Sequence, residues 1–260
     1  MRFTSLGSGS KGNSLLVSTK DGTTSTTVMM DCGFGVREIT RRLKRVGCEP
    51  ADLSAIVVTH EHSDHVGSAL TLARRYRIPL WMSYGTFQSL GKDFSDIELN
   101  FCRDGDSFSV NDFQIDAFTI SHDAREPLQF SVRDGRVKFG MLTDTGQITS
   151  HISNALQGCD ALMIECNYDE QMLAKSVYPF YLKKRISSIY GHLSNDCAAG
   201  FLDEHGMSRL KTIVAAHLSQ NNNLPELVKK AIDVVVGKNA IEVVIATQDT
   251  GFEWMELTGN

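Results

Sequence analysis

The sequence predicts an α/β fold, and three observations lead to that prediction. Short runs rich in β-branched and apolar residues alternate with segments whose apolar residues recur at helical spacing. This alternation runs along all 260 residues without a repeat, a low-complexity tract or a linker rich in Pro, Gly or Ser. Hydrophobic residues make up 42% of the chain and charged residues 22%, as in ordinary globular proteins. We therefore expect one α/β domain over residues 1–260.

The first third of the chain predicts strands, tight turns and one helix. Short β-prone runs cover residues 2–6, 14–19 and 26–31, and glycines punctuate them at Gly7, Gly9, Gly12 and Gly22. Residues 36–46 place apolar side chains at helical spacing among five basic ones, and Gly47 favours a helix end there.

The remaining elements follow in the same alternation. We expect a buried strand at 55–58, a helix at 65–76 and a strand at 80–83. The segment 98–142 is rich in strands, of which one ends at Ser121-His122, and Asp134-Gly135 predicts a hairpin turn. In the last third we expect strands at 161–164, 212–216 and 241–246 and helices at 196–204 and 224–236.

The segment 59–67, Thr-His-Glu-His-Ser-Asp-His-Val-Gly, carries the strongest functional signal. Three imidazoles and a carboxylate follow a buried strand, where packing favours Val and Ile. Such clusters are typical of transition-metal sites, and a His-rich polar turn is the alternative. His60 and His62 lie on one side of an extended chain, whereas Asp64 and His65 lie past the turn and point elsewhere. One loop can therefore serve two metals, and its spacing differs from the His-Glu-x-x-His of helical zinc proteases.

Net charge and cysteine content exclude several classes of protein. A net charge of −5 argues against a generally basic nucleic-acid coat protein but allows a local basic rim around an acidic site. None of the six cysteines forms a C-x-x-C pair, which argues against a zinc ribbon or a thioredoxin motif. The N-terminus lacks the apolar core of a secretory signal, and no apolar run approaches 18 residues. We expect a cytoplasmic protein with reduced thiols and no membrane partner.

A glycine-rich loop at 7–12, Gly-Ser-Gly-Ser-Lys-Gly, fits the dinucleotide-binding pattern only in part. That pattern requires a helix to begin within it, and the residues that follow predict a strand. Lys11 precedes the last Gly instead of following it, so the loop is not a P-loop either. Two interpretations remain open: a backbone anion nest that faces a phosphate, and a hairpin turn that needs positive φ.

Four more polar residues stand at or near predicted strand ends: His122, Asp144, His192 and His217. Functional sites in α/β folds collect outside the carboxyl ends of strands, so these side chains are candidates to complete two metal sites. For His122, a polar surface position is the alternative.

The order of these residues resembles the metallo-β-lactamase superfamily. The motif H-x-H-x-D-H at 60–65, the lone His122, Asp144 in a Thr-Asp-Thr-Gly turn and the C-terminal His217 follow that superfamily's ligand order over nearly the whole chain. The resemblance implies an αββα sandwich, in which two mixed β-sheets pack face to face, helices flank them and the metals bind at one edge.

Shorter motifs narrow the resemblance. Gly-His-Leu-Ser at 191–194 and Ala-His-Leu-Ser at 216–219 look like the two C-terminal His motifs of ribonuclease Z-type members. Residues 6–14, Glu-Cys-Asn at 165–167 and the run 218–222 are similar to the YycJ/WalJ group, whose members are bacterial and regarded as DNA exonucleases. The chain departs from that pattern at Tyr168, where a His is frequent, and this puts any role for the position in doubt.

The resemblance implies a role for each candidate. One metal would be bound by His60, His62 and His122. The other would be bound by Asp64, His65 and His217, and Asp144 would bridge the two. Asp31 would be a carboxylate behind the ligands that orients one of them, and Glu165 would orient His192.

A metal pair of this kind supports phosphodiester hydrolysis. Two ions about 3.5–4 Å apart make a bridging hydroxide at neutral pH and clamp the oxygens of an in-line displacement. We expect that hydroxide to be the nucleophile, with Asp64 and Asp144 holding the metals and orienting the water. His192 is the expected general acid on the leaving oxygen. The ligands suit zinc and also admit manganese.

Three functions compete. The first is a nuclease, most simply a DNA exonuclease, and the metal set with His192 supports it. The second is a hydrolase of small substrates, such as a cyclic phosphodiesterase, thioesterase or lactonase. The third, a non-catalytic metal-dependent binding module, has the least support because the ligand set is complete.

Candidate substrate contacts come from two places. Basic residues cluster at 74–77 and at Lys183, Lys184 and Arg185, the latter near aromatics that can stack bases. For each cluster a solvated helix face is the alternative. Ser10 and Asn13 of the glycine-rich loop are further candidates.

Short intervals favour a minimal catalytic core over an RNA-processing enzyme. Only 21 residues separate His122 from Asp144, so the tRNA-gripping arm of ribonuclease Z has no room there. The interval between Asp144 and His192 is too short for the extra domain of larger RNA-processing relatives. The chain also ends about 40 residues after His217, which argues against a glyoxalase II-like helical domain. The sequence leaves the oligomeric state open, a dimer included.

Overall fold

A computed structural model describes residues 1–22, 24–205, 209–237 and 240–259, and it contains two seven-stranded sheets. The first sheet has the order β14-β1-β2-β3-β4-β5-β6. Its strands are β1 (Arg2–Gly7), β2 (Ser14–Asp21), β3 (Thr24–Met30), β4 (Ala55–Val57), β5 (Leu80–Met82), β6 (Leu99–Phe101) and β14 (Phe252–Glu256). Strands β3 to β6 run parallel to one another, and β1, β2 and β14 pair antiparallel.

The second sheet has the order β13-β12-β11-β10-β9-β8-β7. Its strands are β7 (Ser107–Val110), β8 (Phe113–Thr119), β9 (Leu128–Arg133), β10 (Lys138–Leu142), β11 (Ala161–Glu165), β12 (Thr212–Ala216) and β13 (Glu242–Ile245). Strands β10 to β13 are parallel, and β7 to β10 form an antiparallel meander. The hairpin turn expected at Asp134-Gly135 joins β9 to β10, and Gly135 has φ 84°.

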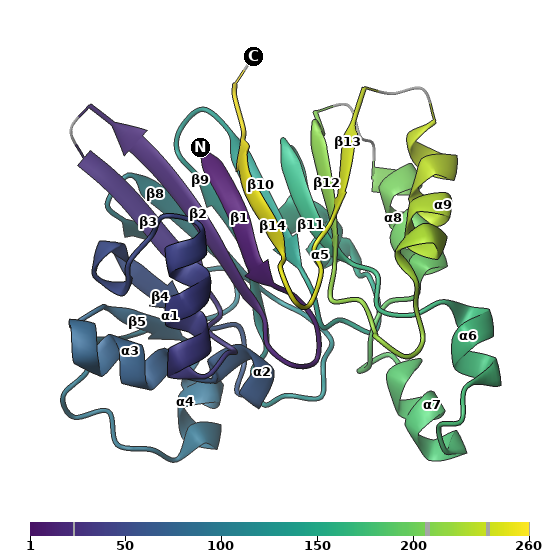
Figure 1. The fold of residues 1–260 in the computed structure, drawn as a ribbon, viewed down its shortest axis with the longest axis horizontal. Coiled ribbons are helices and arrows are strands. Elements are labelled where there is room, and N and C mark those ends of the chain that lie inside the picture. The colour runs from purple at the N-terminus through teal and green to yellow at the C-terminus, as the bar shows by residue number, and fades with distance from the viewer. Residues whose placement is uncertain (23, 206–208, 238–239, 260) are drawn as a thin grey trace.

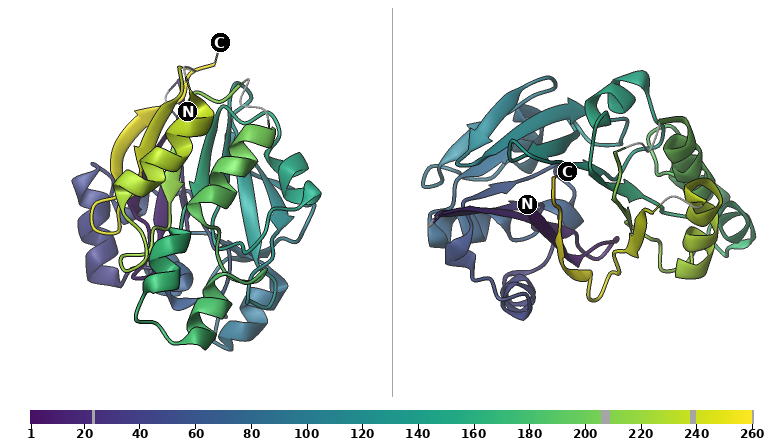
Figure 2. Two further views of the ribbon diagram at one scale, coloured as in Figure 1. Left: turned by 90° about the vertical axis from the view of Figure 1, so that its right-hand side faces the viewer. Right: turned by 90° about the horizontal axis from the view of Figure 1, so that it is seen from above.

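Helices cover the outer face of each sheet (Figures 1 and 2). Those of the first half are α1 (Val36–Arg45), α2 (Ser63–Val66), α3 (Ala69–Tyr76) and α4 (Tyr84–Leu90), with a 3-10 turn at Pro50–Asp52. Those of the second half are α5 (Ser150–Leu156), α6 (Glu170–Lys175), α7 (Phe180–Ile186), α8 (Asn195–His205) and α9 (Pro225–Val236).

Three apolar layers hold this arrangement together, because successive strand side chains point to opposite faces. Along β2, Val17 packs between the sheets against the layer that includes Phe130, whereas Leu16 packs outward against α1 and its Leu43. A third layer joins the second sheet to α5, α8 and α9, for example through Ile164. The expected αββα sandwich is confirmed, with two mixed sheets and helices outside.

The predicted helix at 65–76 is wrong in one respect, because two helices occupy that region. Helix α2 ends at Val66 and α3 begins at Ala69. Between them Gly67 has φ 26° and ψ −100°, and a side chain there would overlap the backbone of Cys32 and Gly33. The break therefore lets the chain pack against the turn after β3. Helices α4 to α7 and strand β14 were not expected from the sequence.

Two observations concern the class of protein. None of the described helices is long and apolar enough to cross a membrane. All six cysteines are free, and five of them are buried.

Candidate metal centre

The candidate residues meet because the strands that precede them share a direction. Asp31 follows β3 and His60 lies just beyond β4, which is parallel to β3. Asp144 lies just beyond β10, Glu165 ends β11 and His217 follows β12, and these three strands are also parallel. One edge of the sandwich therefore collects the side chains, at the end where α2 and α7 lie in Figure 1.

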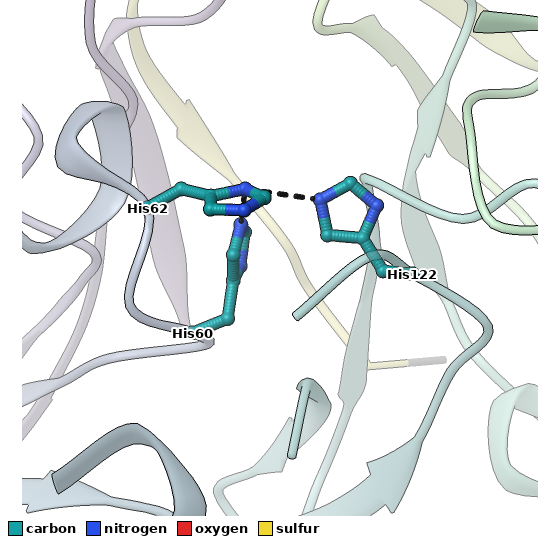
Figure 3. Close-up of side chains that lie close together, drawn as sticks. All are labelled: His60, His62 and His122. Carbon is teal, nitrogen blue, oxygen red and sulfur yellow. Dashed lines mark hydrogen bonds between the residues drawn. The ribbon is translucent and has the colours of Figure 1, made fainter. Parts of the chain in front are cut away.

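Three histidines form the first cluster, and their rings converge in Figure 3. His60 Nε2 lies 3.0 Å from His62 Nδ1, which lies 3.2 Å from His122 Nε2. Two ligands each about 2.1 Å from a tetrahedral zinc ion are roughly 3.4 Å apart, so these nitrogens have nearly the spacing of one ion's ligands. The structure thus brings His122, from the second sheet, to the loop that carries the other two.

Asp64, His65 and His217 form the second cluster, with ligand atoms within 4.8 Å of one another. Asp64 Oδ2 lies 3.6 Å from His65 Nε2 and 3.8 Å from His217 Nε2. Asp144 lies between the clusters: it groups with His60 and His65, and its Oδ2 is 3.3 Å from His65 Nε2. This is the place that a bridging ligand requires.

A buried carboxylate orients His65. Asp31 Oδ2 lies 2.7 Å from His65 Nδ1, so that nitrogen donates its proton and Nε2 faces the cluster. Asp31 also accepts hydrogen bonds from the backbone N–H and the hydroxyl of Thr59. The Thr59 hydroxyl in turn lies 2.9 Å from His60 Nδ1, so one hydroxyl links ligands of both clusters.

A second buried carboxylate, Glu165, serves two histidines. Its Oε1 lies 2.8 Å from the Nδ1 atoms of both His192 and His217. Each imidazole therefore donates from Nδ1 and keeps Nε2 for another partner. Glu165 Oε2 accepts from the backbone N–H groups of Thr145 and Leu193, so the carboxylate itself is held in place.

The electrostatics of the site favour a cation. Burial alone raises the pKa of Asp144, but His217 and His65 outweigh burial and hold that pKa well below its usual range. Burial lowers the pKa of His65, yet Asp144 and Asp31 raise it to about 9. Burial and the neighbouring His65 hold the pKa of His60 well below its usual range, so His60 is neutral. Asp144 faces His65 Nε2 and would offer the same negative charge to a divalent ion, which would replace the proton on Nε2, while Asp31 keeps the proton on Nδ1.

Two further features fit a metal pair. Asp144 Oδ2 and His217 Nε2 are buried, and neither has a hydrogen-bond partner among the described residues. A buried polar atom without a partner is costly, and a metal ligand bond satisfies it. Asp31, Asp144 and His217 also adopt left-handed backbone angles, with φ of 59°, 57° and 56°, which is uncommon for residues other than Gly and clusters at functional sites.

The glycine-rich loop is a structural turn. Gly7 and Gly12 have φ of 153° and 141°, and a Cβ on Gly12 would overlap the ring of Phe34. Most of the loop's N–H groups already have partners: Gly9 N donates to Asn13 and Lys11 N to Gln248. These observations favour the hairpin-turn interpretation over the anion nest.

The residues that were expected to contact substrate lie in different surroundings. Asn13 is buried and its amide lies 3.1 Å from His65 Nε2, so it supports the ligand loop. Ser10 lines a small cavity beside His192. On α7, Lys183 donates to the carbonyl of Ala174. In the same helix, Lys184 is exposed and Arg185 forms an ion pair with Asp123 at 2.6 Å. Substrate contact by these residues stays a prediction.

Sequence reasoning missed three supporting residues. Thr59 joins Asp31 to two histidines, and its place at the end of β4 beside β3 was a usable signal. Glu61 accepts a hydrogen bond from the backbone of Arg125 and so ties the ligand loop to the loop after His122. Asp123 lies 3.5 Å from His122 Nε2, and no pattern in the sequence marks it.

Comparison with known proteins places this geometry in context. Residues 26–217 match the family described as the beta-lactamase superfamily domain. The exodeoxyribonuclease YycJ of Bacillus anthracis is 32% identical over 247 residues, which are 94% of this chain and 92% of that protein. The exodeoxyribonuclease WalJ of Streptococcus pneumoniae is 34% identical over 232 residues, 87% of this chain and 84% of that protein. The metallo-beta-lactamase fold protein YhfI from Bacillus subtilis shares the fold, with a TM-score of 0.74 and 18% identity over 98% of this chain and 99% of that one.

Proposed function

The chain belongs to the beta-lactamase superfamily, and from this premise we propose that it is a metal-dependent hydrolase that degrades DNA from strand ends. The observation that carries the proposal is the meeting of two ligand clusters with the Glu165–His192 pair at one edge of the sandwich. The two relatives named as exodeoxyribonucleases support a nucleic-acid substrate, and this chain aligns with most of the length of each.

Two divalent ions, zinc or manganese, fit the clusters. His60, His62 and His122 would hold one ion, and Asp64, His65 and His217 the other, with Asp144 shared between them. Ions bound there supply Lewis-acid chemistry, which acidifies water and offsets the charge that builds on phosphoryl oxygens. Asp31 and Thr59 keep the imidazoles in the orientation that this binding needs.

The chain's own groups divide the proton transfers between them. Asp64 is partly exposed at the mouth of the site and can accept a hydrogen bond from the attacking water. His192 is more exposed than every candidate ligand histidine except His62, and Glu165 holds its Nδ1 proton. Burial lowers the pKa of His192, but Glu165 outweighs burial and raises it, so the imidazole carries a proton to give from Nε2. We assign that proton to the departing oxygen of the phosphodiester.

The experiment that tests the proposal is hydrolysis of end-labelled linear duplex DNA against a closed circle of the same sequence. The protein would be supplied with zinc or manganese, and the His192→Ala variant would be run beside it. We expect metal-dependent loss of the linear substrate only, with a rate at least 100-fold lower in the variant.

Other results would redirect the assignment. Cleavage of the circle would replace end-dependent action with internal cleavage. If neither DNA is cut while a cyclic phosphodiester, thioester or lactone turns over, the protein is a hydrolase of small substrates and the DNA proposal fails.

A further inference from the structure

A small cavity of about 220 Å³ opens beside His192 and is separate from the metal ligands. Its walls come from distant parts of the chain: Ser10 of the glycine-rich loop, Tyr178 between α6 and α7, Arg185 of α7, and Ser219 after β12. Helix α7 lies at the lower edge of the molecule in Figure 1, beyond the ends of the strands, and it has no buried residue. It therefore contributes no fully buried side chain to the apolar core.

The polar groups of this cavity are mostly donors. Tyr178 Oη accepts a hydrogen bond from Asn221 Nδ2 at 2.7 Å, which leaves its own proton to donate. Arg185 uses Nε and Nη2 on Asp123, at 2.8 and 2.6 Å, and a guanidinium has five N–H groups. The lining also includes the hydroxyl groups of Ser10 and Ser219, the imidazole of His192, the amide of Asn167 and the carboxylate of Asp123, which is paired with Arg185. Hydroxyl, phenol and guanidinium donors together suit an anion with several acceptor oxygens.

Size limits what can enter. Small-molecule pockets start at about 300 Å³, so a cavity of 220 Å³ holds one phosphate with part of its sugar and excludes a duplex. The lining also includes the apolar side chains of Leu182 and Ile186 from α7.

Asp123 places the cavity next to the reacting centre. Its Oδ1 lies 3.5 Å from His122 Nε2, while its Oδ2 binds Arg185. A carboxylate in contact with a ligand histidine on one side thus positions the guanidinium on the other. A strand whose scissile phosphate meets the metal centre would have its neighbouring phosphate within reach of Arg185.

We propose that this cavity binds the terminal phosphate of a single DNA strand, with Tyr178 and Arg185 as the residues that select phosphorylated ends. The proposal rests on the proposed function and extends it, because it gives the end requirement a physical basis. Helix α7 forms part of the cavity wall, so a strand that continued in that direction would meet the helix, whereas a terminal phosphate would not need to pass it.

The test compares linear duplexes that differ only in whether one end carries a phosphate or a hydroxyl, prepared at the 5′ and at the 3′ end. We expect the metal-loaded protein to prefer one phosphorylated end at least 10-fold. Tyr178→Phe and Arg185→Gln should each reduce that preference at least fivefold. The preference is a ratio of rates on two substrates measured with the same protein, so any change that a variant causes in basal turnover cancels from it.

Two matched variants control for the chemistry of the changes. Tyr190→Phe removes a phenol hydroxyl from an exposed residue of the same segment that does not line the cavity. Arg209→Gln breaks an Arg–Asp pair in a different part of the chain, and the Arg209 side chain is exposed to a similar extent as that of Arg185, 59% against 63%. Both should keep the full end preference.

A second readout separates this proposal from the proposed function. A deoxynucleoside monophosphate should inhibit hydrolysis of bis-p-nitrophenyl phosphate, and Arg185→Gln and Tyr178→Phe should weaken that inhibition at least fivefold. If the natural protein cuts no DNA but this pattern holds, the proposed function fails and the phosphate cavity stands. Equal inhibition of all proteins, or equal rates on phosphate and hydroxyl ends, would overturn the cavity assignment.

Discussion

Glu165 illustrates how one residue can set the chemistry of several others. Its Oε1 receives the Nδ1 protons of His192 and His217, yet these two histidines have different tasks. His217 is buried, and its Nε2, which has no hydrogen-bond partner in the part of the chain that the structure describes, faces the candidate metal cluster. His192 is 23% exposed and borders the cavity beside α7. The same hydrogen bond therefore prepares one imidazole as a ligand and the other as an acid.

The acid assignment leads to a prediction about leaving groups. His192→Ala should keep its metal content and lose between 100- and 10,000-fold in turnover of DNA, where the departing alkoxide needs a proton. With bis-p-nitrophenyl phosphate, whose leaving group needs none, the loss should stay below 10-fold. Steady-state rates on both substrates with metal analysis make the comparison. Equal losses on both would rule out the general-acid role.

At the scale of elements, the ligand loop is shaped by close backbone contacts. The N–H of Asn13 donates to the carbonyl of Asp64 at 2.8 Å, and the N–H of Cys32 donates to that of His65 at 2.8 Å. Gly33 lies directly against the Asp64 carbonyl, where any Cβ would overlap it. The turn after β3, the glycine-rich loop and α2 thus form one packed unit, and a small residue at the centre is a condition of ligand placement.

Gly33→Ala should therefore affect both stability and metal binding. Relieving the overlap requires α2 to shift, and overpacking of this kind costs about 1–3 kcal/mol. We expect a lower melting temperature and at least a tenfold weaker affinity for zinc, measured by calorimetry.

Gly200→Ala in α8 is the matched control, since a Cβ there meets nothing within 4 Å. Alanine is the better helix former, so this variant should be as stable as the natural protein or more so. A Gly33→Ala protein with unchanged melting and zinc affinity would show that α2 does not depend on this contact.

At the scale of the whole molecule, the candidate metals join the two sheets. His60, His62, Asp64 and His65 follow a strand of the first sheet, whereas His122, Asp144 and His217 follow strands of the second. Bound ions would therefore link the halves of the sandwich at one edge, in addition to the apolar layer between the sheets.

Metal binding should accordingly stabilise the fold. For each ion bound, zinc at 100 times its dissociation constant adds about 2.7 kcal/mol, which is roughly 5–10 °C in melting temperature for a chain of this size. Calorimetry with zinc and with a chelator measures the difference, and Asp144→Asn should lose at least half of it. A single transition in the same scan would support one domain over residues 1–260, and two transitions would contradict it. If a chelator leaves the melting temperature unchanged, the ligand assignment is contradicted.

Local signals account for the elements that were predicted. The β-prone runs of β2 and β3 and the helical spacing of Ile39 and Leu43 in α1 are visible in the sequence because each depends on near neighbours. Helices α6 and α7 were missed since they bury little: only Leu173 is buried in α6, and no residue in α7. Without an apolar stripe, a short helix leaves no periodic signal.

The sequence alone determined the chemistry of the site: three imidazoles and a carboxylate after a buried strand, with further His and Asp residues at later strand ends. Those residue types and their spacing are local features of the sequence, so they can be recognised without a structure. Only the tertiary structure decided which of them meet. It brought His122 to His62, set Glu165 between two histidines, and placed Arg185 against Asp123. Each of these contacts joins residues that are 27 or more positions apart in the sequence. The packing of the two sheets brings such residues together, and no local pattern in the sequence predicts the contact.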